Sequence, residues 1–222
     1  MRGLGRIFAP DERDRGFLLA RPKRMPTGLR FWYDRAWFGN QGSKPHCVGF
    51  AWVHVLEDAP VARSGPAPFH DPADIYARAQ RLDEWPGEAY DGTSVRAGAK
   101  ALQELGYLSS YRWAFDLETV VRSLLRDGPV VVGSSWFSSM FEPQIRKDAQ
   151  GRRRKTLVIE EGSTVVGGHA YVLNGVNTAA KIVRMKNSWG AWGDRGRAAI
   201  SFDTMRELLD DAGEACMPTE LP

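Results

Sequence analysis

The chain has 222 residues, enough for one large domain or two small ones, and its 43% hydrophobic and 26% charged residues are typical of a soluble globular protein. A net charge of +3, without a basic stripe interleaved with aromatic residues, argues against nucleic-acid binding. The sequence contains no apolar run of about 18 residues and no apolar run of signal-peptide type near its start. Two cysteines cannot supply a disulfide framework, so we expect a cytoplasmic location, or release without a cleaved signal.

The first 30 residues are interpreted as an N-terminal extension. They are rich in charged side chains and contain the segment Gly3-Leu4-Gly5. Two glycines so close to the end of a chain favour a flexible terminus.

Helices are expected in the first half of the chain. A polar turn over Asn40–Pro45 leads into an apolar run with helical spacing that begins at Val48. Three further helices are predicted from N-capping residues and stop signals, over 73–82, 95–105 and 117–126.

Short β-type runs replace the helical pattern after Pro129, and a last helix is expected from Asp203 to about Asp211. The runs cover residues 130–133, 156–159, 169–176, 181–186 and 197–202. Helices followed by strands predict an α+β fold.

Cys47 lies where the polar turn meets the first helix. The free N–H groups and the dipole of a helix N-terminus stabilise an anion, so a thiol there is expected to lose its proton more easily than a free thiol. Because the thiolate is the nucleophilic form, the sequence predicts a reactive cysteine at this position.

Two distant segments contain the side chains that such a thiolate needs. His169, in Gly167–Leu173, can pair with the thiolate and protonate a leaving group. Asn187, in Lys186–Gly193, can fix the tautomer of the imidazole. Gln41, six residues before Cys47, carries an amide donor suited to an oxyanion hole.

At these residues the sequence resembles the papain-like cysteine peptidases. The resemblance covers about residues 30 to 215, and its most specific part is the segment Asn187-Ser188-Trp189-Gly190. The order Gln, Cys, His, Asn is that of the family. His169 follows Cys47 by 122 residues and Asn187 follows it by 140, against about 130–150 in the family.

The resemblance implies a two-lobed fold, with a helical lobe over about 40–128 and an antiparallel, barrel-like β lobe over about 129–215. It implies a cysteine-type peptidase in which Cys47 attacks a peptide carbonyl, His169 transfers the proton and Asn187 orients His169. Gly92 and Gly168 would bind the substrate backbone, although Gly92 can also be a simple turn glycine, and Trp189 would shield the His–Asn hydrogen bond. A polypeptide is the expected partner, with no cofactor and no metal.

Three departures from the family pattern surround the nucleophile. Lys44 replaces a cysteine that normally closes a disulfide, Pro45 replaces a glycine beside the substrate, and Val48 replaces a large aromatic residue. About 35 residues precede the turn at Gln41, too few for the inhibitory pro-segment of about a hundred residues that relatives often carry. His46 is interpreted as a rim residue, because neighbours in a helix point in different directions.

Two other functions remain open from the sequence. One is related acyl-transfer chemistry, in an isopeptide or peptidoglycan amide hydrolase or a transpeptidase. The other is a papain-like module that only binds. Cys216 is expected to be a half-buried or exposed free thiol, and Gly151–Lys155 a solvated hairpin tip, with an anion-binding patch as the alternative.

Overall fold

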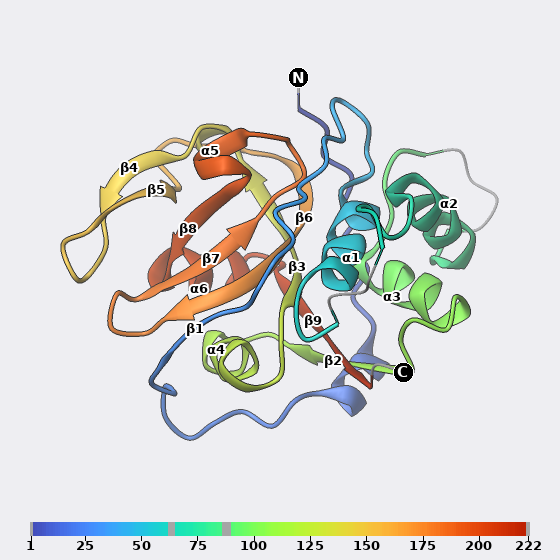
Figure 1. Ribbon diagram of the computed structural model, residues 1–222, viewed down its shortest axis with the longest axis horizontal. Coiled ribbons are helices and arrows are strands. Elements are labelled where there is room, and N and C mark those ends of the chain that lie inside the picture. The colour runs from blue at the N-terminus through green and yellow to red at the C-terminus, as the bar shows by residue number, and fades with distance from the viewer. Residues whose placement is uncertain (1, 62–64, 86–89, 221–222) are drawn as a thin grey trace.

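A computed structural model describes residues 2–61, 65–85 and 90–220. It has a mixed α+β architecture, in which α1–α3 gather on one side and the strands on the other (Figure 1). The helices are η1 (Glu12–Phe17), α1 (Cys47–Glu57), α2 (Pro72–Leu82), α3 (Val95–Glu104), α4 (Leu117–Arg126), η2 (Ser138–Phe141), α5 (Trp192–Arg195) and α6 (Phe202–Asp210).

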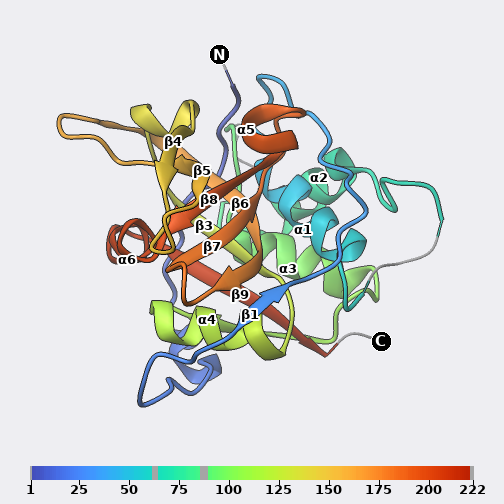
Figure 2. The ribbon, with the colours of Figure 1, turned by 60° about the vertical axis from the view of Figure 1, so that its left-hand side comes forward.

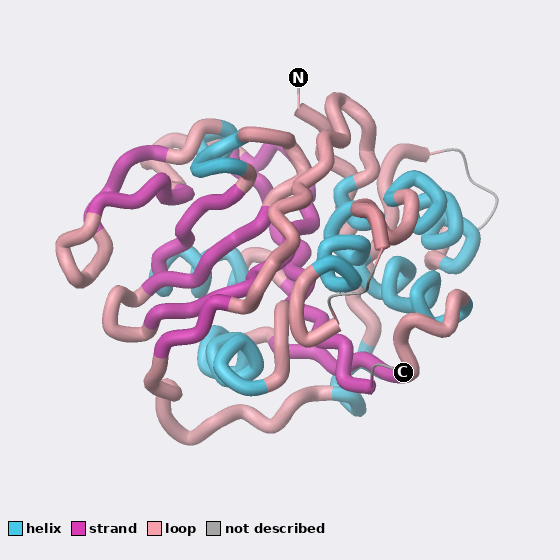
Figure 3. Tube along the Cα trace, in the orientation of Figure 1, coloured by secondary structure: helices cyan, strands magenta, loops and turns pink. Residues whose placement is uncertain are grey.

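The strands form one open, nine-stranded sheet within the described residues, with the order β2-β9-β3-β6-β7-β8-β5-β4 and with β1 paired to β6 (Figure 3). All pairs are antiparallel except β5 with β8. The strands are β1 (Leu29–Phe31), β2 (Ser110–Ala114), β3 (Val130–Phe137), β4 (Gln144–Lys147), β5 (Arg153–Leu157), β6 (Val165–Asn177), β7 (Ile182–Lys186), β8 (Arg197–Ser201) and β9 (Glu214–Glu220).

The central strands bury both of their faces. On β3, Val130 and Val132 belong to the core beneath α4 and α6, whereas Val131 belongs to the core beneath α1 and α3. Successive residues of a strand point to opposite faces, which explains why the run from Val130 is apolar throughout. Figure 2 shows α6 on the side of the sheet away from α1–α3.

Helix α1 is buried along its whole length. Its glycine, Gly49, has no room for a side chain, because an added Cβ would lie 2.1 Å from the Pro72 carbonyl oxygen. Trp52 packs directly against Gly98 of α3, because an added Cβ at Gly98 would lie 2.3 Å from the indole ring. Close packing of α1–α3 therefore fixes the position of Cys47, the first residue of α1.

The α+β class expected from the sequence is confirmed, and most predicted elements are present with shifted ends. Strands β1, β2, β4 and β9 were not predicted. Cys216 is fully buried on β9, so the expectation of an exposed or half-buried thiol is wrong. The basic run begins at the tip of the β4–β5 hairpin and continues along β5. No helix of the described residues is long and apolar enough to cross a membrane.

A buried ion pair joins the end of α1 to the end of β7. The Lys186 Nζ atom lies 2.5 Å from the Asp58 Oδ1 atom, and both side chains are fully buried. The Asn174 amide donates a hydrogen bond of 2.8 Å to the other oxygen of Asp58. The pair holds the helix that begins at Cys47 against the strand that ends beside Asn187.

Replacing Asp58 by asparagine is expected to lower the free energy of unfolding by about 3–5 kcal/mol, because the Lys186 ammonium would stay buried without its counter-ion. Asp203→Asn is the matched control, since Asp203 is 96% exposed and lies 3.4 Å from Arg206, and it should leave the denaturation midpoint almost unchanged. Urea unfolding of both variants checks this. Equal midpoints would show that the buried pair does not hold the two halves together.

Candidate active site

Cys47 lies at the N-terminus of α1, as expected, but its thiol is fully buried. Burial raises the pKa of Cys47 to about 11, although hydrogen bonds from the backbone of Ala170 and Gly5 act in the opposite direction. The prediction of an easily ionised thiol is therefore wrong for this arrangement, because the loss of hydration outweighs the helix N-terminus. The hydrogen bond from Ala170 places the thiol beside the residue that follows His169.

His169 and Asn187 form a direct pair. The His169 Nε2 atom lies 2.8 Å from the Asn187 Oδ1 atom, and the amide Oδ1 atom can only accept, so Nε2 carries the proton. The other ring nitrogen, Nδ1, is buried without a hydrogen-bond partner among the described residues. The imidazole is thus held in the tautomer whose Nδ1 can accept a proton.

Two tryptophans enclose the imidazole. Trp189 stacks on His169 with ring centroids 4.5 Å apart, and Trp136 approaches edge-on at 4.7 Å. Trp189 comes from the Asn187–Gly190 segment and Trp136 from β3. Together they exclude water from the His169–Asn187 hydrogen bond. Burial lowers the pKa of His169 to about 4, with the bond to Asn187 acting in the opposite direction.

This lowered pKa makes stability depend on pH. Between pH 6.5 and about 4 the unfolded chain binds a proton at His169 and the folded chain does not, so stability falls as the pH falls. Wild type should lose about 3 kcal/mol more than His169→Gln between pH 7 and pH 4. Urea titrations at several pH values check this. Burial also lowers the pKa of His54, but His54 is present in both proteins, so its contribution cancels in the comparison. Parallel curves would contradict the burial of a neutral His169.

Gln41 is held close to this pair. Its backbone N–H donates to the Ser188 carbonyl oxygen at 2.9 Å, and its Oε1 accepts from the Ser188 hydroxyl at 2.5 Å. The side-chain Nε2 donates to the carbonyl oxygens of Lys44, at 2.8 Å, and Gly3, at 3.1 Å. The amide expected to serve an oxyanion is therefore occupied by a carbonyl of the chain itself.

The N-terminal segment, residues 2–7, contacts several of the residues around this site. Gly5 and Arg6 both donate backbone hydrogen bonds to the Gly168 carbonyl oxygen, at 3.1 and 3.0 Å. Thr93 donates to Gly5 at 2.9 Å and accepts from Ile7 at 2.9 Å. Figure 1 shows the N-terminus at the boundary between the helical and strand-rich halves. The terminus is packed in place, so the expectation of a flexible Gly3-Leu4-Gly5 is wrong.

The two glycines expected to bind substrate backbone both contact this segment. An added Cβ at Gly168 would lie 2.1 Å from the Arg6 carbonyl oxygen, and one at Gly92 would lie 2.6 Å from the Gly5 carbonyl oxygen. Gly92 itself donates its N–H to the Tyr76 hydroxyl at 2.8 Å, and the backbone pairing falls on Thr93 instead. Five of the seven predicted site residues contact the segment: Gln41, Cys47, Gly92, Gly168 and Trp189. His169 follows Gly168 in the chain and is bonded to Asn187.

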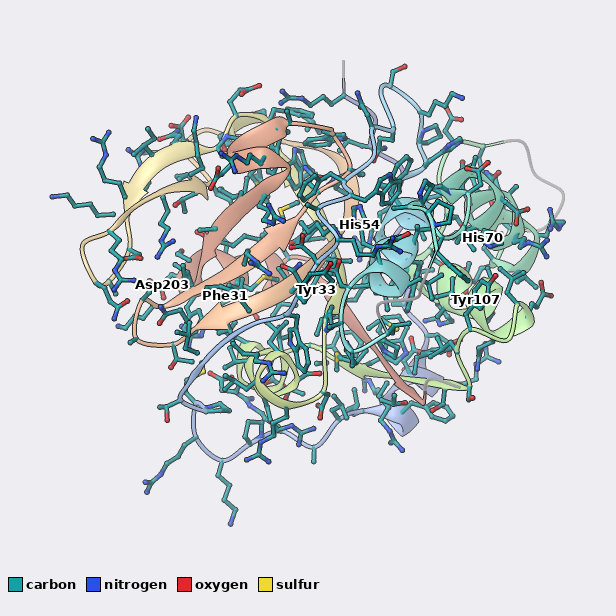
Figure 4. The ribbon with its side chains drawn as sticks, viewed as in Figure 1. Phe31, Tyr33, His54, His70, Tyr107 and Asp203 are labelled. Carbon is teal, nitrogen blue, oxygen red and sulfur yellow. The ribbon has the colours of Figure 1, made fainter. Side chains whose placement is uncertain are left out.

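The remaining histidines have other contacts. His46 precedes α1 and its ring lies 4.4 Å from that of Tyr76. The Nε2–H group of His54 donates to the Phe38 carbonyl oxygen at 3.0 Å, inside the helical half. His70 pairs with Asp74 at 2.7 Å on the outer side of the helical half (Figure 4). Trp136, Arg6 and Thr93 contact the site or its N-terminal segment and were not predicted. Neither was Glu214, which pairs with Arg6 at 2.9 Å. No cluster of His, Cys, Asp and Glu among the described residues is arranged to hold a metal ion.

Comparisons with known proteins find the same architecture in solved structures. Xylellain, a cysteine protease from Xylella fastidiosa, superposes with a TM-score of 0.74 at 16% identity, over 100% of this chain and 97% of that one. Digestive procathepsin L2 of Tenebrio molitor gives 0.65 at 17% identity, over 99% and 78%. Procathepsin B S9 of Trypanosoma congolense gives 0.59 at 12% identity, over 100% and 84%. No family model and no curated protein sequence matches the chain.

The chain therefore has the papain-like cysteine protease fold. At these identities the likeness defines the fold, and what the site does depends on its own residues.

Proposed function

We propose that the chain is a cysteine-type peptidase that hydrolyses peptide bonds through a thioester at Cys47. The observation that carries this proposal is the His169–Asn187 hydrogen bond, which leaves Nδ1 of His169 free to accept a proton. Cys47 accepts a hydrogen bond from the backbone of Ala170, the residue after His169. The solved structures of the same fold, which include cysteine proteases, support it.

The reaction begins when the thiol proton passes to Nδ1 of His169 and the sulfur attacks the carbonyl carbon. Negative charge then develops on the carbonyl oxygen, where the Gln41 amide and the Cys47 backbone N–H can donate to it. Collapse breaks the carbon–nitrogen bond, and His169 returns the proton to the leaving amine. Water hydrolyses the thioester, which releases a carboxylate and restores the thiol. Asn187 keeps the imidazole in the required tautomer throughout.

A cleavage assay in water enriched in oxygen-18 tests this function. Peptide substrates should be cut by wild type or by the Gly5→Ala variant. In this variant the added methyl group would lie 2.1 Å from the Pro45 carbonyl oxygen, so residues 2–7 are expected to leave the site. The new carboxylate should contain the heavy oxygen, and Cys47→Ala should be inactive in both backgrounds. Transfer of the acyl group to an added amine would instead favour a transpeptidase. No cleavage in either background would contradict a peptidase.

A further inference from the structure

A cavity of about 510 Å³ lies on the strand-rich half of the chain, apart from the candidate active site. Residues of β1, β4, β5, β7, α5 and β8 line it, and none of the residues predicted for the active site is among them. Figure 1 shows β4 and β5 at the end of the sheet farthest from α1–α3. The volume of the cavity lies within the range of about 300–1,000 Å³ that is typical of small-molecule sites.

Positive charge is in excess in this cavity. Five cationic side chains line it, and Asp194, which is exposed, is the only carboxylate among the described lining residues. The cations come from β5, β7 and β8: Arg153, Arg154, Lys155, Arg184 and Arg197. Two carboxylates outside the lining, Asp34 and Asp148, pair with three of the arginines and offset part of this charge. The cavity would therefore attract an anion.

Two of the arginines are held in fixed positions. Asp34, which is 4% exposed, accepts from Arg197 at 2.5 and 3.1 Å and lies 3.6 Å from Arg184. Arg184 also donates to the Asn174 side-chain oxygen and to the Trp32 carbonyl oxygen, each at 2.8 Å. Its Nη1 atom has no hydrogen-bond partner among the described residues, so two N–H donors remain for a ligand. A guanidinium oriented in advance loses little further freedom when it binds an anion.

Arg153 and Lys155 add charge that no carboxylate offsets. Both residues are exposed on β5, and neither forms an ion pair within the part of the chain that the structure describes. Arg154, between them, differs because it pairs with Asp148 at 3.1 Å. An added anion would reduce the repulsion among these cations and would break no existing ion pair of Arg153 or Lys155.

The rest of the lining is apolar. Its apolar residues are Phe31, Ile145, Ile182, Val183, Ala198 and Ala199. Phe31 and Ile145 are 41% and 49% exposed, and the Arg184 guanidinium lies 4.8 Å from the centre of the Phe31 ring. A ligand that is only an anion would leave this apolar surface in contact with water. An anion attached to an apolar or aromatic body would cover it as well.

We propose that this cavity binds a phosphorylated small molecule whose body is apolar or aromatic. A phosphate ester has about two negative charges and three acceptor oxygens, which suit a set of guanidinium groups better than a single carboxylate does. Of the two interpretations that the sequence left open for Gly151–Lys155, the cavity favours anion binding for Arg153–Lys155. The site is separate from the candidate active site, and the inference does not depend on the proposed function.

Isothermal titration calorimetry with the full-length chain tests this proposal. Adenosine diphosphate, pyrophosphate and adenosine are the probes, because they supply phosphates with a body, phosphates alone and a body alone. Adenosine diphosphate should bind at least about tenfold more tightly than either of the others, since it alone contacts both the cations and the apolar surface. Pyrophosphate binding as tightly as adenosine diphosphate, or no binding of adenosine diphosphate at millimolar concentration, would overturn the proposal.

Two double variants separate the cavity from the net charge of the chain. Arg153→Gln with Lys155→Gln should weaken binding of adenosine diphosphate at least about tenfold, because two charged contacts to the phosphates are lost. Lys23→Gln with Arg24→Gln, the matched control, removes the same charge from exposed residues that do not line the cavity, and should bind like wild type. All four residues are exposed, so both variants are expected to fold. Equal weakening in the two double variants would contradict a site at this cavity.

Phe31→Ala tests the apolar part of the site. Removing this half-exposed ring should weaken binding of adenosine diphosphate severalfold and leave binding of pyrophosphate unchanged, because only the body of the ligand contacts it. Calorimetry with both probes gives the comparison. If the substitution leaves binding of adenosine diphosphate unchanged, or weakens binding of both probes equally, the assignment of an apolar or aromatic body is wrong.

Discussion

His169→Ala is expected to lower kcat by at least about 10⁴-fold, because it removes the group that takes the proton from Cys47 and returns it to the leaving amine. The structure supports a single histidine in this role, since Nδ1 of His169 is free while Nε2 is bonded to Asn187. Steady-state kinetics in the Gly5→Ala background, where the site is expected to be open, give the comparison.

Two companion variants define the effect. Asn187→Ala should lower kcat less than His169→Ala does, because stacking between His169 and Trp189 still restrains the imidazole ring. His70→Ala, on the outer side of the helical half, should turn over like its parent (Figure 4). Full activity in His169→Ala would remove the proposed mechanism and return His46, the nearest histidine in the sequence, to consideration.

Gln41→Ala is expected to lower kcat by about 10²–10³, or roughly 3–4 kcal/mol, with little change in KM. The amide donor is used chiefly when charge develops on the carbonyl oxygen, so its loss affects the transition state more than the bound substrate. Gln41→Glu should lower kcat further than Gln41→Ala, since a carboxylate repels an oxyanion and offers no donor. The Gly5→Ala background is needed here too, because Gln41 also holds Gly3 in the wild-type chain.

Ser188→Ala is the control for this prediction. It removes the 2.5 Å hydrogen bond that orients the Gln41 side chain but leaves the Nε2 donor in place. A smaller loss than in Gln41→Ala is therefore expected. If Gln41→Ala cleaves peptides at the parental rate, the oxyanion does not form at this amide.

Local signals in the sequence were sufficient for most of the helices. Asp116 accepts from the Thr119 backbone N–H, and α4 covers 117–126 as predicted. Asp71 likewise caps α2. These contacts lie within three residues in the chain, so the sequence itself shows both partners.

Strand β9 was missed because its neighbours lie far away in the chain. Residues 214–220 contain Pro218, which argues against a central strand. The structure accommodates it because β3 pairs with β9 only at Glu214, Ala215 and Cys216, and Pro218 lies beyond that ladder. Burial of Cys216 follows from this pairing, and no local pattern indicates it.

The candidate site likewise combines local motifs, which the sequence shows, with contacts between distant residues, which it does not show. Cys47, His169 and Asn187 stand in motifs that can be recognised in the sequence, and the structure brings them to one place. The covering of that place could not be predicted, because glycines that signal flexibility also permit the closest backbone contact. Gly3 and Gly5 permit close contact with the backbone of the turn before Cys47. Glu214, the side chain that pairs with Arg6, lies 208 residues further along the chain.

The most direct test of the central claim is to treat the Gly5→Ala chain, in which the site is expected to be open, with an epoxide affinity probe for thiol peptidases. The adduct is then mapped by mass spectrometry. We predict one adduct, on Cys47, that forms much more slowly in His169→Ala, because the thiolate needs its imidazole partner. Cys216 should stay unmodified in the folded protein, since it is fully buried. Labelling of Cys47 at the same rate with and without His169, or no labelling of Cys47 at all, would contradict a cysteine peptidase built on these residues.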